Sequence, residues 1–186
     1  MDNPTQTAPA KIRTFKSRID IPTTTRIPLV ALLNQQLANT LDFYTQVKQA
    51  HWNVKGSQFI MLHELFDKVA EAVFEYIDEI AERATALGGV ALGTVRMAAH
   101  NSMLEEYPTR AVTGEEHLNA LADRLADYAA SVRDAIEKSD ELGDADTTDL
   151  FTDISRDMDK YLWFLEAHLQ DQFPEGFKGV KGQSAD

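Results

Sequence analysis

The sequence of 186 residues contains no cysteine. This absence excludes thiolate nucleophiles, iron–sulfur clusters, cysteine-ligated zinc and disulfides. Any bound metal ion must therefore use nitrogen and oxygen ligands. No stretch approaches the roughly 20 consecutive apolar residues of a membrane helix, and the first thirty residues lack the apolar run of a signal peptide. The sequence therefore predicts a cytoplasmic protein with no membrane partner.

Positive charge is scarce, since 18 Lys and Arg residues stand against 30 Asp and Glu, which gives a net charge of -12. Residues 1–26 are the exception, because this segment carries five bases and two acids. An acidic body repels nucleic acid and favours cations, whereas a mobile basic segment can bind phosphate. We expect a flexible basic arm over residues 1–27, with packing on a neighbouring subunit as the alternative for Arg13 and Lys16. The candidate DNA-binding residues are Lys11, Arg13, Lys16 and Arg18.

Strand-like alternation is also missing, and apolar residues recur instead at steps of three and four. This spacing predicts four long helices, which cover residues 29–54, 58–87, 114–138 and 146–172. Glycines and Pro174 separate or end them, and Thr113 with Glu116 forms a capping box before the third helix. A short helix is expected near residues 94–103.

Four helices of about 25 to 28 residues, each about 40 Å long, form a four-helix bundle. The first and third connections are short, but about 25 residues join the second helix to the third, enough to cross the length of the bundle. The predicted fold class is all-α: a ferritin-like four-helix bundle over residues 28–172, with a long crossover that carries a short helix. Residues 173–186 are expected to form a flexible C-terminal tail.

Ferritin-like bundles commonly bind two irons through Glu residues and paired Glu-x-x-His motifs. None of the five histidines follows a glutamate at that spacing, because the residues three positions before them are Lys48, Ile60, Met97, Gly114 and Leu165. The usual site inside the bundle cannot form. A metal site of this protein must lie elsewhere.

The second predicted helix carries two pairs of possible ligands, His63 with Asp67 and Asp78 with Glu82. Each pair spans one helical turn, and all four residues fall on a stripe roughly 100° wide. The centres of the pairs lie about 22 Å apart along the helix axis, so no single ion can touch both. The stripe is either a solvated face or half of a site that two antiparallel copies complete about a two-fold axis. His51, just before this helix, could add a second nitrogen.

Three segments carry a resemblance to the Dps, or miniferritin, family over about residues 28–169. They are the run His51-Trp52-Asn53-Val54, the ligand pattern of the second helix, and residues 155–164. The resemblance implies a hollow homododecamer that oxidises Fe(II) with hydrogen peroxide or oxygen, stores ferric mineral and protects DNA. It implies that one subunit contributes His51, His63 and Asp67, and that its two-fold mate contributes Asp78 and Glu82.

The implied metal is iron as Fe(II) and Fe(III), without haem, and zinc is a competing ion. Carboxylates and imidazoles suit these ions, and anionic oxygen ligands favour Fe(III). Trp52 is a candidate trap for stray one-electron oxidants, with a core position as the alternative. The competing functions are a DNA-compacting or structural cage with a weak or zinc-loaded site, and a monomeric helical signalling bundle.

Asp144, Asp149 and Asp153 resemble the acidic lining of the family's three-fold pores, through which iron enters the cage. Three-fold symmetry would turn each into a ring of carboxylates that attracts Fe(II). Helix capping by Asp144 or Asp146, and solvation of the other carboxylates, is the alternative. The remaining histidines lack partners at ligand spacing, and we expect core or surface positions for them; they are His100, His117 and His168.

Overall fold

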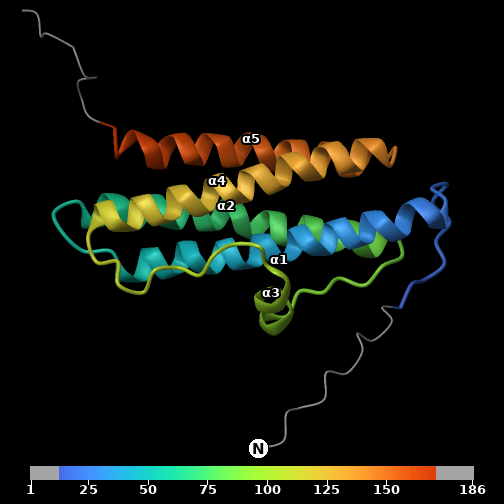
Figure 1. The fold of residues 1–186 in the computed structure, drawn as a ribbon, viewed down its shortest axis with the longest axis horizontal. Coiled ribbons are helices and arrows are strands. Elements are labelled where there is room, and N and C mark those ends of the chain that lie inside the picture. The colour runs from blue at the N-terminus through green and yellow to red at the C-terminus, as the bar shows by residue number, and fades with distance from the viewer. Residues whose placement is uncertain (1–12, 171–186) are drawn as a thin grey trace, which may run out of the picture.

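The computed structural model describes residues 13–170, which form five α-helices. Their bounds are α1 Thr23–Asn53, α2 Phe59–Ala86, α3 Val95–Asn101, α4 Gly114–Glu141 and α5 Ala145–Ala167. The four long helices run alongside one another, with α1 packed on α2 and α4 on α5 (Figure 1). Among the described residues no strand forms beyond one isolated bridge, between Lys55 and Thr113. The predicted all-α bundle is confirmed.

The connection between α2 and α4 crosses the length of the bundle, so that these two helices run in the same direction (Figure 1). It carries the short helix α3, as expected, and α1 holds it with amide side chains. Asn34 donates to the carbonyl of Val90 at 3.0 Å and accepts from the Leu92 N–H at 2.8 Å. Asn39 accepts from the Met103 N–H at 3.0 Å. These side chains satisfy backbone groups that no helix or sheet would pair.

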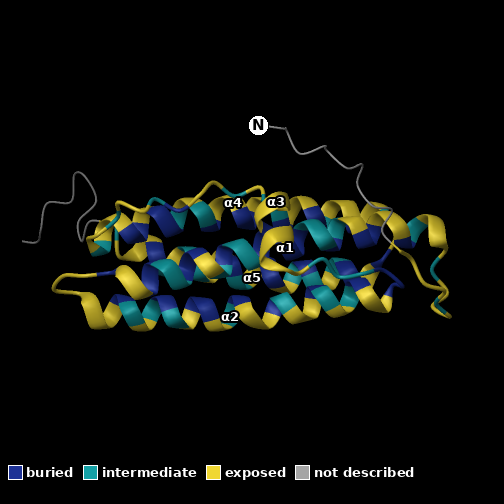
Figure 2. Cartoon of the chain, turned by 90° about the horizontal axis from the view of Figure 1, so that it is seen from below, coloured by how far each residue is buried: buried dark blue, intermediate teal, exposed yellow. Residues whose placement is uncertain are grey.

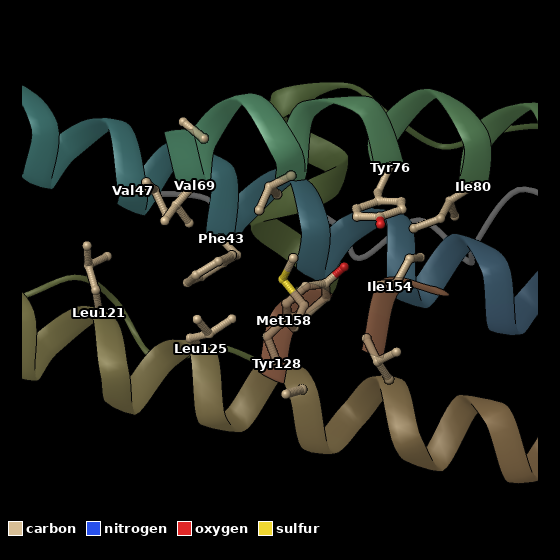
Figure 3. Close-up of a cluster of buried hydrophobic side chains, with 14 of the residues drawn as sticks. Phe43, Val47, Val69, Tyr76, Ile80, Leu121, Leu125, Tyr128, Ile154 and Met158 are labelled. Atoms are coloured by element: carbon tan, nitrogen blue, oxygen red, sulfur yellow. The ribbon is translucent and has the colours of Figure 1, made fainter. Parts of the chain in front are cut away.

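Each of the four long helices carries buried residues along one side and exposed residues along the other (Figure 2). Near the middle of the core, the rings of Phe43 and Tyr128 stack with centroids 5.5 Å apart, and Met158 lies beside them (Figure 3). The Tyr128 hydroxyl is paired with Thr40 at 2.7 Å. Most buried polar side-chain atoms of the described residues are paired in this way, and Oε1 of Gln46 and Nε2 of His117 are buried without a partner.

Helix α1 starts at Thr23, six residues earlier than the apolar spacing predicts. The cause is tertiary, because Arg26 is buried and its guanidinium bonds the carbonyl of Ile21, the hydroxyl of Thr23 and the carbonyl of Leu87. The last of these bonds joins the first turn of α1 to the end of α2. Helix α5 ends at Ala167 rather than at residue 172, and residues 171 and 172 lie outside the described range.

The predicted arm over residues 1–27 differs from the structure at its inner boundary. Residues 23–27 belong to α1, and residues 13–22 lie against the body, where the Phe15 N–H donates to the Gly88 carbonyl at 2.8 Å. Arg13, Lys16 and Arg18 are exposed on this segment. Lys11 and the predicted tail over residues 173–186 lie outside the described residues. None of the described helices is long and apolar enough to cross a membrane.

Gly88 ends α2 in a left-handed conformation, with φ at +82°. Its N–H bonds the carbonyl of Thr85, and the N–H of Gly89 bonds that of Ala84, the pattern of a Schellman motif. A Cβ atom at Gly88 would lie 2.6 Å from the Phe15 carbonyl oxygen and 2.8 Å from the Arg26 guanidinium. This glycine therefore lets the N-terminal segment dock.

We predict that Gly88→Ala destabilises the protein and releases the N-terminal segment. Gly143→Ala is the matched control, because Gly143 is also left-handed, at φ +74°, but has open space around it. The control should lose about 1–2 kcal/mol of unfolding free energy. Gly88→Ala should lose about 1–3 kcal/mol more, from the collision. Urea denaturation measures both, and faster tryptic cleavage after Lys16 should accompany Gly88→Ala alone; equal losses and equal cleavage would contradict the docking role.

Candidate metal half-sites

His51 and His63 face each other across the turn that joins α1 to α2. His51 lies in the last turn of α1 and His63 in the first turns of α2, and residues 54–58 reverse the chain between them. The imidazole rings stack with centroids 3.7 Å apart and planes 21° apart. His51 is buried and His63 is partly buried. The turn thus brings together two of the predicted ligands.

Reciprocal hydrogen bonds orient the two rings. Nδ1 of His51 lies 2.9 Å from the carbonyl oxygen of His63, and Nδ1 of His63 lies 2.9 Å from that of His51. A carbonyl oxygen only accepts, so each Nδ1 carries the proton and donates. In the neutral form of each imidazole, Nε2 then keeps the lone pair. A neutral imidazole anchored in this way is the form that binds a metal ion.

Asp67 lies one helical turn after His63 and next to the histidine pair. Its Oδ1 accepts a hydrogen bond from Nζ of Lys48 at 2.6 Å and lies 3.7 Å from Nδ1 of His51. The hydrogen bond from Lys48 is the main cause that lowers the pKa of the Asp67 carboxyl. The carboxylate is therefore an anion at neutral pH. Since it is 44% exposed, a cation can approach it from solvent.

Asp78 and Glu82 lie farther along α2 and are both exposed. Within residues 13–170, no group of three or more His, Asp or Glu side chains has the arrangement to hold a metal ion. This holds also for the histidine pair with Asp67. The predicted ligands thus fall into two separate sets in one chain, here called half-sites: His51, His63 and Asp67 form the first, and Asp78 and Glu82 form the second. Their separation follows from helix geometry, since fifteen residues rise about 22 Å.

Trp52 is 66% exposed, so the core position considered for it does not apply to the single chain. Other large apolar side chains near the first half-site are exposed too, and they are Phe59, Ile60 and Met61, at 42%, 62% and 46%. A cluster of exposed apolar side chains marks a surface that a partner covers. The first half-site thus lies beside a candidate interface.

The three aspartates of the predicted pore differ in their surroundings. Asp144 is buried, and both of its carboxylate oxygens accept from Nη2 of Arg83, at 2.7 and 2.8 Å. In the single chain, Asp144 therefore does not face solvent as a pore residue would. The Asp144 side chain also makes no capping hydrogen bond to the α5 backbone. Asp149 and Asp153 are exposed, and Asp153 is paired with Arg156.

The sequence analysis did not identify the basic partners of two carboxylates, Lys48 for Asp67 and Arg83 for Asp144. Lys48 precedes His51 by three residues and so shares its helix face, a signal that could have been read. Arg83 and Asp144 are 61 residues apart, and no local pattern links them. Of the remaining histidines, His117 is buried against Tyr107, while His100 and His168 are exposed, as core and surface positions require.

Comparison with known proteins shows which family the chain is similar to. Residues 30–172 match the model of the ferritin-like domain. The chain is 44% identical over 161 residues to the DNA protection during starvation protein of Agrobacterium fabrum, covering 87% of this chain and 99% of that protein.

Solved structures agree with this relation. A Dps of Mycobacterium smegmatis superposes with a TM-score of 0.82 at 31% identity, over 86% of this chain and 96% of that one. The Dps of Vibrio cholerae O1, described as a member of a broad superfamily of ferritin-like diiron-carboxylate proteins, gives a TM-score of 0.78 at 28% identity, over 85% and 99%.

We predict that Arg83→Met lowers the unfolding free energy by about 3 kcal/mol or more, because it leaves the buried Asp144 carboxylate unpaired. Arg83→Met with Asp144→Leu should recover much of this loss, since no charge then stays buried. Arg133→Met, which breaks the exposed pair with Asp159, should cost less than about 1 kcal/mol. Urea denaturation of the three variants tests the ranking, and a double variant as unstable as the single one would refute this account.

Proposed function

The chain belongs to the Dps family of ferritin-like proteins, and from this premise we propose that it is a ferroxidase whose iron sites form between two subunits. One observation carries the proposal. The stacked histidines lie beside the Asp67 carboxylate, with Nδ1 of His51 3.7 Å from its Oδ1, while two further carboxylates, of Asp78 and Glu82, lie too far along α2 to join them.

A two-fold axis between antiparallel α2 helices would unite the half-sites. Asp78 and Glu82 of a second copy then lie opposite His63 and Asp67 of the first, and symmetry creates two such sites per pair. The exposed Trp52, Phe59 and Ile60 support this pairing, because an interface would cover them. Membership of the Dps family supports the further proposal that such pairs assemble into a hollow homododecamer.

The residue types of the two half-sites suit Fe(II) as a substrate. Imidazole nitrogens and carboxylate oxygens bind it without thiolates, and the anionic oxygens favour the Fe(III) product. Two Fe(II) ions each give one electron to hydrogen peroxide, which takes up two protons and leaves as two water molecules. Because both electrons arrive together, no hydroxyl radical is released. Oxygen is the alternative oxidant, and Zn(II) would compete for the same ligands.

Storage requires that iron reach the inside of the cage. Asp149 and Asp153 remain the candidates for a three-fold pore, since both are exposed on α5. Asp144 is a poor candidate because it is buried with both oxygens bound to Arg83, whereas the pair of Asp153 with Arg156 is exposed to solvent. A ring of carboxylates would concentrate Fe(II) at such a pore. The cage would then hold the ferric mineral apart from the rest of the cytoplasm, the location we propose for the protein.

We predict that His63→Ala and Asp78→Ala each slow peroxide-driven Fe(II) oxidation by about tenfold or more, since even loss of an outer partner of a ligand costs about that much. Ferric absorbance after anaerobic loading measures the rate. His100→Ala, an exposed histidine outside both half-sites, is the control.

Mixing the two variants tests whether the site is shared. If two subunits build each site, refolding equal amounts of His63→Ala and Asp78→Ala together should restore about a quarter of the sites. About half of the subunit pairs are then mixed, and each mixed pair contains one complete site out of two. A site built within one chain would give no recovery. Size-exclusion chromatography of the same samples should show a particle about twelve times the chain mass, whereas a monomer would overturn the cage.

Direct DNA binding is a second proposed activity, favoured by the exposed Arg13, Lys16 and Arg18 on an acidic protein. Multiple copies of this segment on one cage would act together on a single duplex. The relative from Agrobacterium fabrum is named for DNA protection, which supports the same role. A structural cage that compacts DNA, with a weak or zinc-loaded metal site, is the competing proposal. If DNA is bound, the protein would associate with the nucleoid.

We predict that deleting residues 1–18 abolishes the retardation of linear DNA in a gel-shift assay at low salt. The wild-type complex should weaken steeply as salt rises, because binding releases counterions from phosphate. Lys178→Gln with Lys181→Gln is the control for charge elsewhere in the chain. Unchanged retardation without residues 1–18 would remove the segment from DNA binding.

A further inference from the structure

A small cavity lies where the N-terminal segment, residues 13–22, packs against the start of α1 and the end of α2 (Figure 1). Its volume is about 150 Å³. This is several times the ~30 Å³ that one water molecule occupies in the liquid, and it is below the ~300 Å³ of the smallest pockets for drug-sized ligands. The polar side chains of the lining are those of Thr14, Lys16, Thr23 and Arg26. The cavity therefore suits a small ion.

Arg26 supplies this cavity with a buried positive charge that no acid balances. The residue is 8% exposed, and its guanidinium donates to the carbonyls of Ile21 and Leu87 and to the hydroxyl of Thr23. All three acceptors are uncharged, and within residues 13–170 no carboxylate forms an ion pair with it. A guanidinium has five N–H donors, so two remain. Since buried charges in proteins are normally paired, Arg26 has both the charge and the donors to bind an anion.

The other polar groups of the lining are hydrogen-bond donors as well. Lys16 brings an exposed ammonium group and Thr14 a hydroxyl. The Thr23 hydroxyl accepts from Arg26, which leaves its own proton to donate. Among the described residues that line the cavity none is acidic, although the chain contains 30 Asp and Glu against 18 Lys and Arg. The first turn of α1 contains no acidic residue either, so the positive end of its helix dipole adds to a lining that attracts anions.

We propose that this cavity is a site for free inorganic phosphate, bound between Arg26 and Lys16. The two spare N–H groups of the guanidinium suit an oxyanion. A tetrahedral phosphate presents four oxygens in different directions, so it can also accept from the threonine hydroxyls and from the ammonium of Lys16. A carboxylate presents only two oxygens in one plane. Because Arg26 is deeply buried, a free ion reaches it more readily than a phosphate that carries the sugars of a DNA backbone.

Bound phosphate fastens the N-terminal segment to the bundle. Lys16 belongs to the segment and Arg26 to α1, so one ion bridges the two. The segment is already tied to the end of α2 by the hydrogen bond from the Phe15 N–H to the Gly88 carbonyl. The phosphate adds a second attachment at the next residue. The cavity contains none of the proposed iron ligands, so this site is independent of the ferroxidase function.

Equilibrium dialysis of the iron-free, full-length protein against radiolabelled phosphate in a chloride buffer tests the site. Iron is left out because Fe(III) itself binds phosphate oxygens. We expect saturable binding to the wild type. Arg26→Lys keeps the charge but loses the planar guanidinium, so it should weaken binding at least about tenfold. Lys16→Gln should weaken it by up to about fivefold, as for an exposed ion pair. Lys138→Gln, which removes an exposed lysine outside the cavity, is the control and should bind as the wild type does.

Competition identifies the occupant. Excess acetate, and a DNA duplex without terminal phosphates, should each leave the labelled phosphate bound. Displacement by acetate would assign the cavity to a carboxylate, such as one from a second copy of the chain, and displacement by the duplex would assign it to the DNA backbone. Either result would overturn free phosphate as the ligand. The site itself is refuted by a wild type without saturable binding, or by equal affinity in Arg26→Lys and Lys16→Gln.

Proteolysis of the wild type tests the bridge even if Arg26→Lys fails to fold. Tryptic cleavage after Lys16 requires the N-terminal segment to come away from the bundle. Since the bridge forms only when the segment is docked, phosphate at ten times its Kd should slow this cleavage about tenfold. Digestion of casein under the same conditions controls for any effect on trypsin. An unchanged rate of cleavage after Lys16 would contradict the bridge.

Discussion

The rise of α2 is the constraint on which the proposed chemistry depends. A helix advances about 1.5 Å per residue, so the ligand pairs at its two halves cannot meet around one ion. The turn after α1 adds His51 to the first pair and does nothing for the second. The single chain therefore keeps the two half-sites apart and leaves apolar side chains such as Trp52 exposed beside one of them. In the proposed function, assembly with a second copy completes the site.

The carboxylates of this acidic chain differ in whether a basic side chain pairs with them and in how far they are exposed to solvent. Asp144 is buried and bound through both oxygens to Arg83, so it stabilises the junction of α2 with α5 and has no capacity left for a metal ion. Asp67 is paired with Lys48 but remains partly exposed, so an incoming cation can compete for it. Asp78 and Glu82 are exposed. The carboxylates proposed to bind iron are thus the exposed ones, and the buried Asp144 belongs to a structural ion pair.

Periodicity and capping predicted the helices, the crossover and its short helix, because these features depend on neighbours along the chain. The capping box of Thr113 and Glu116 forms as predicted. The early start of α1 could not be predicted, since Arg26 reaches the carbonyl of Leu87 across the fold. The same holds for the burial of Asp144. Local sequence patterns determine which side chains share a helix face. Only the packing of the helices determines which of these side chains pair with residues far away in the sequence.

The two ends of the bundle carry different chemistry, and the proposed pairing of subunits would bring them together. One end holds His51, His63 and the Tyr107–His117 pair, and the other holds Gly88, against which residues 13–17 dock. Antiparallel α2 helices place the end of one copy opposite the start of the other. The basic segment of each subunit would then lie near the iron site of its mate. In the proposed function, any DNA held there would be close to where peroxide is consumed.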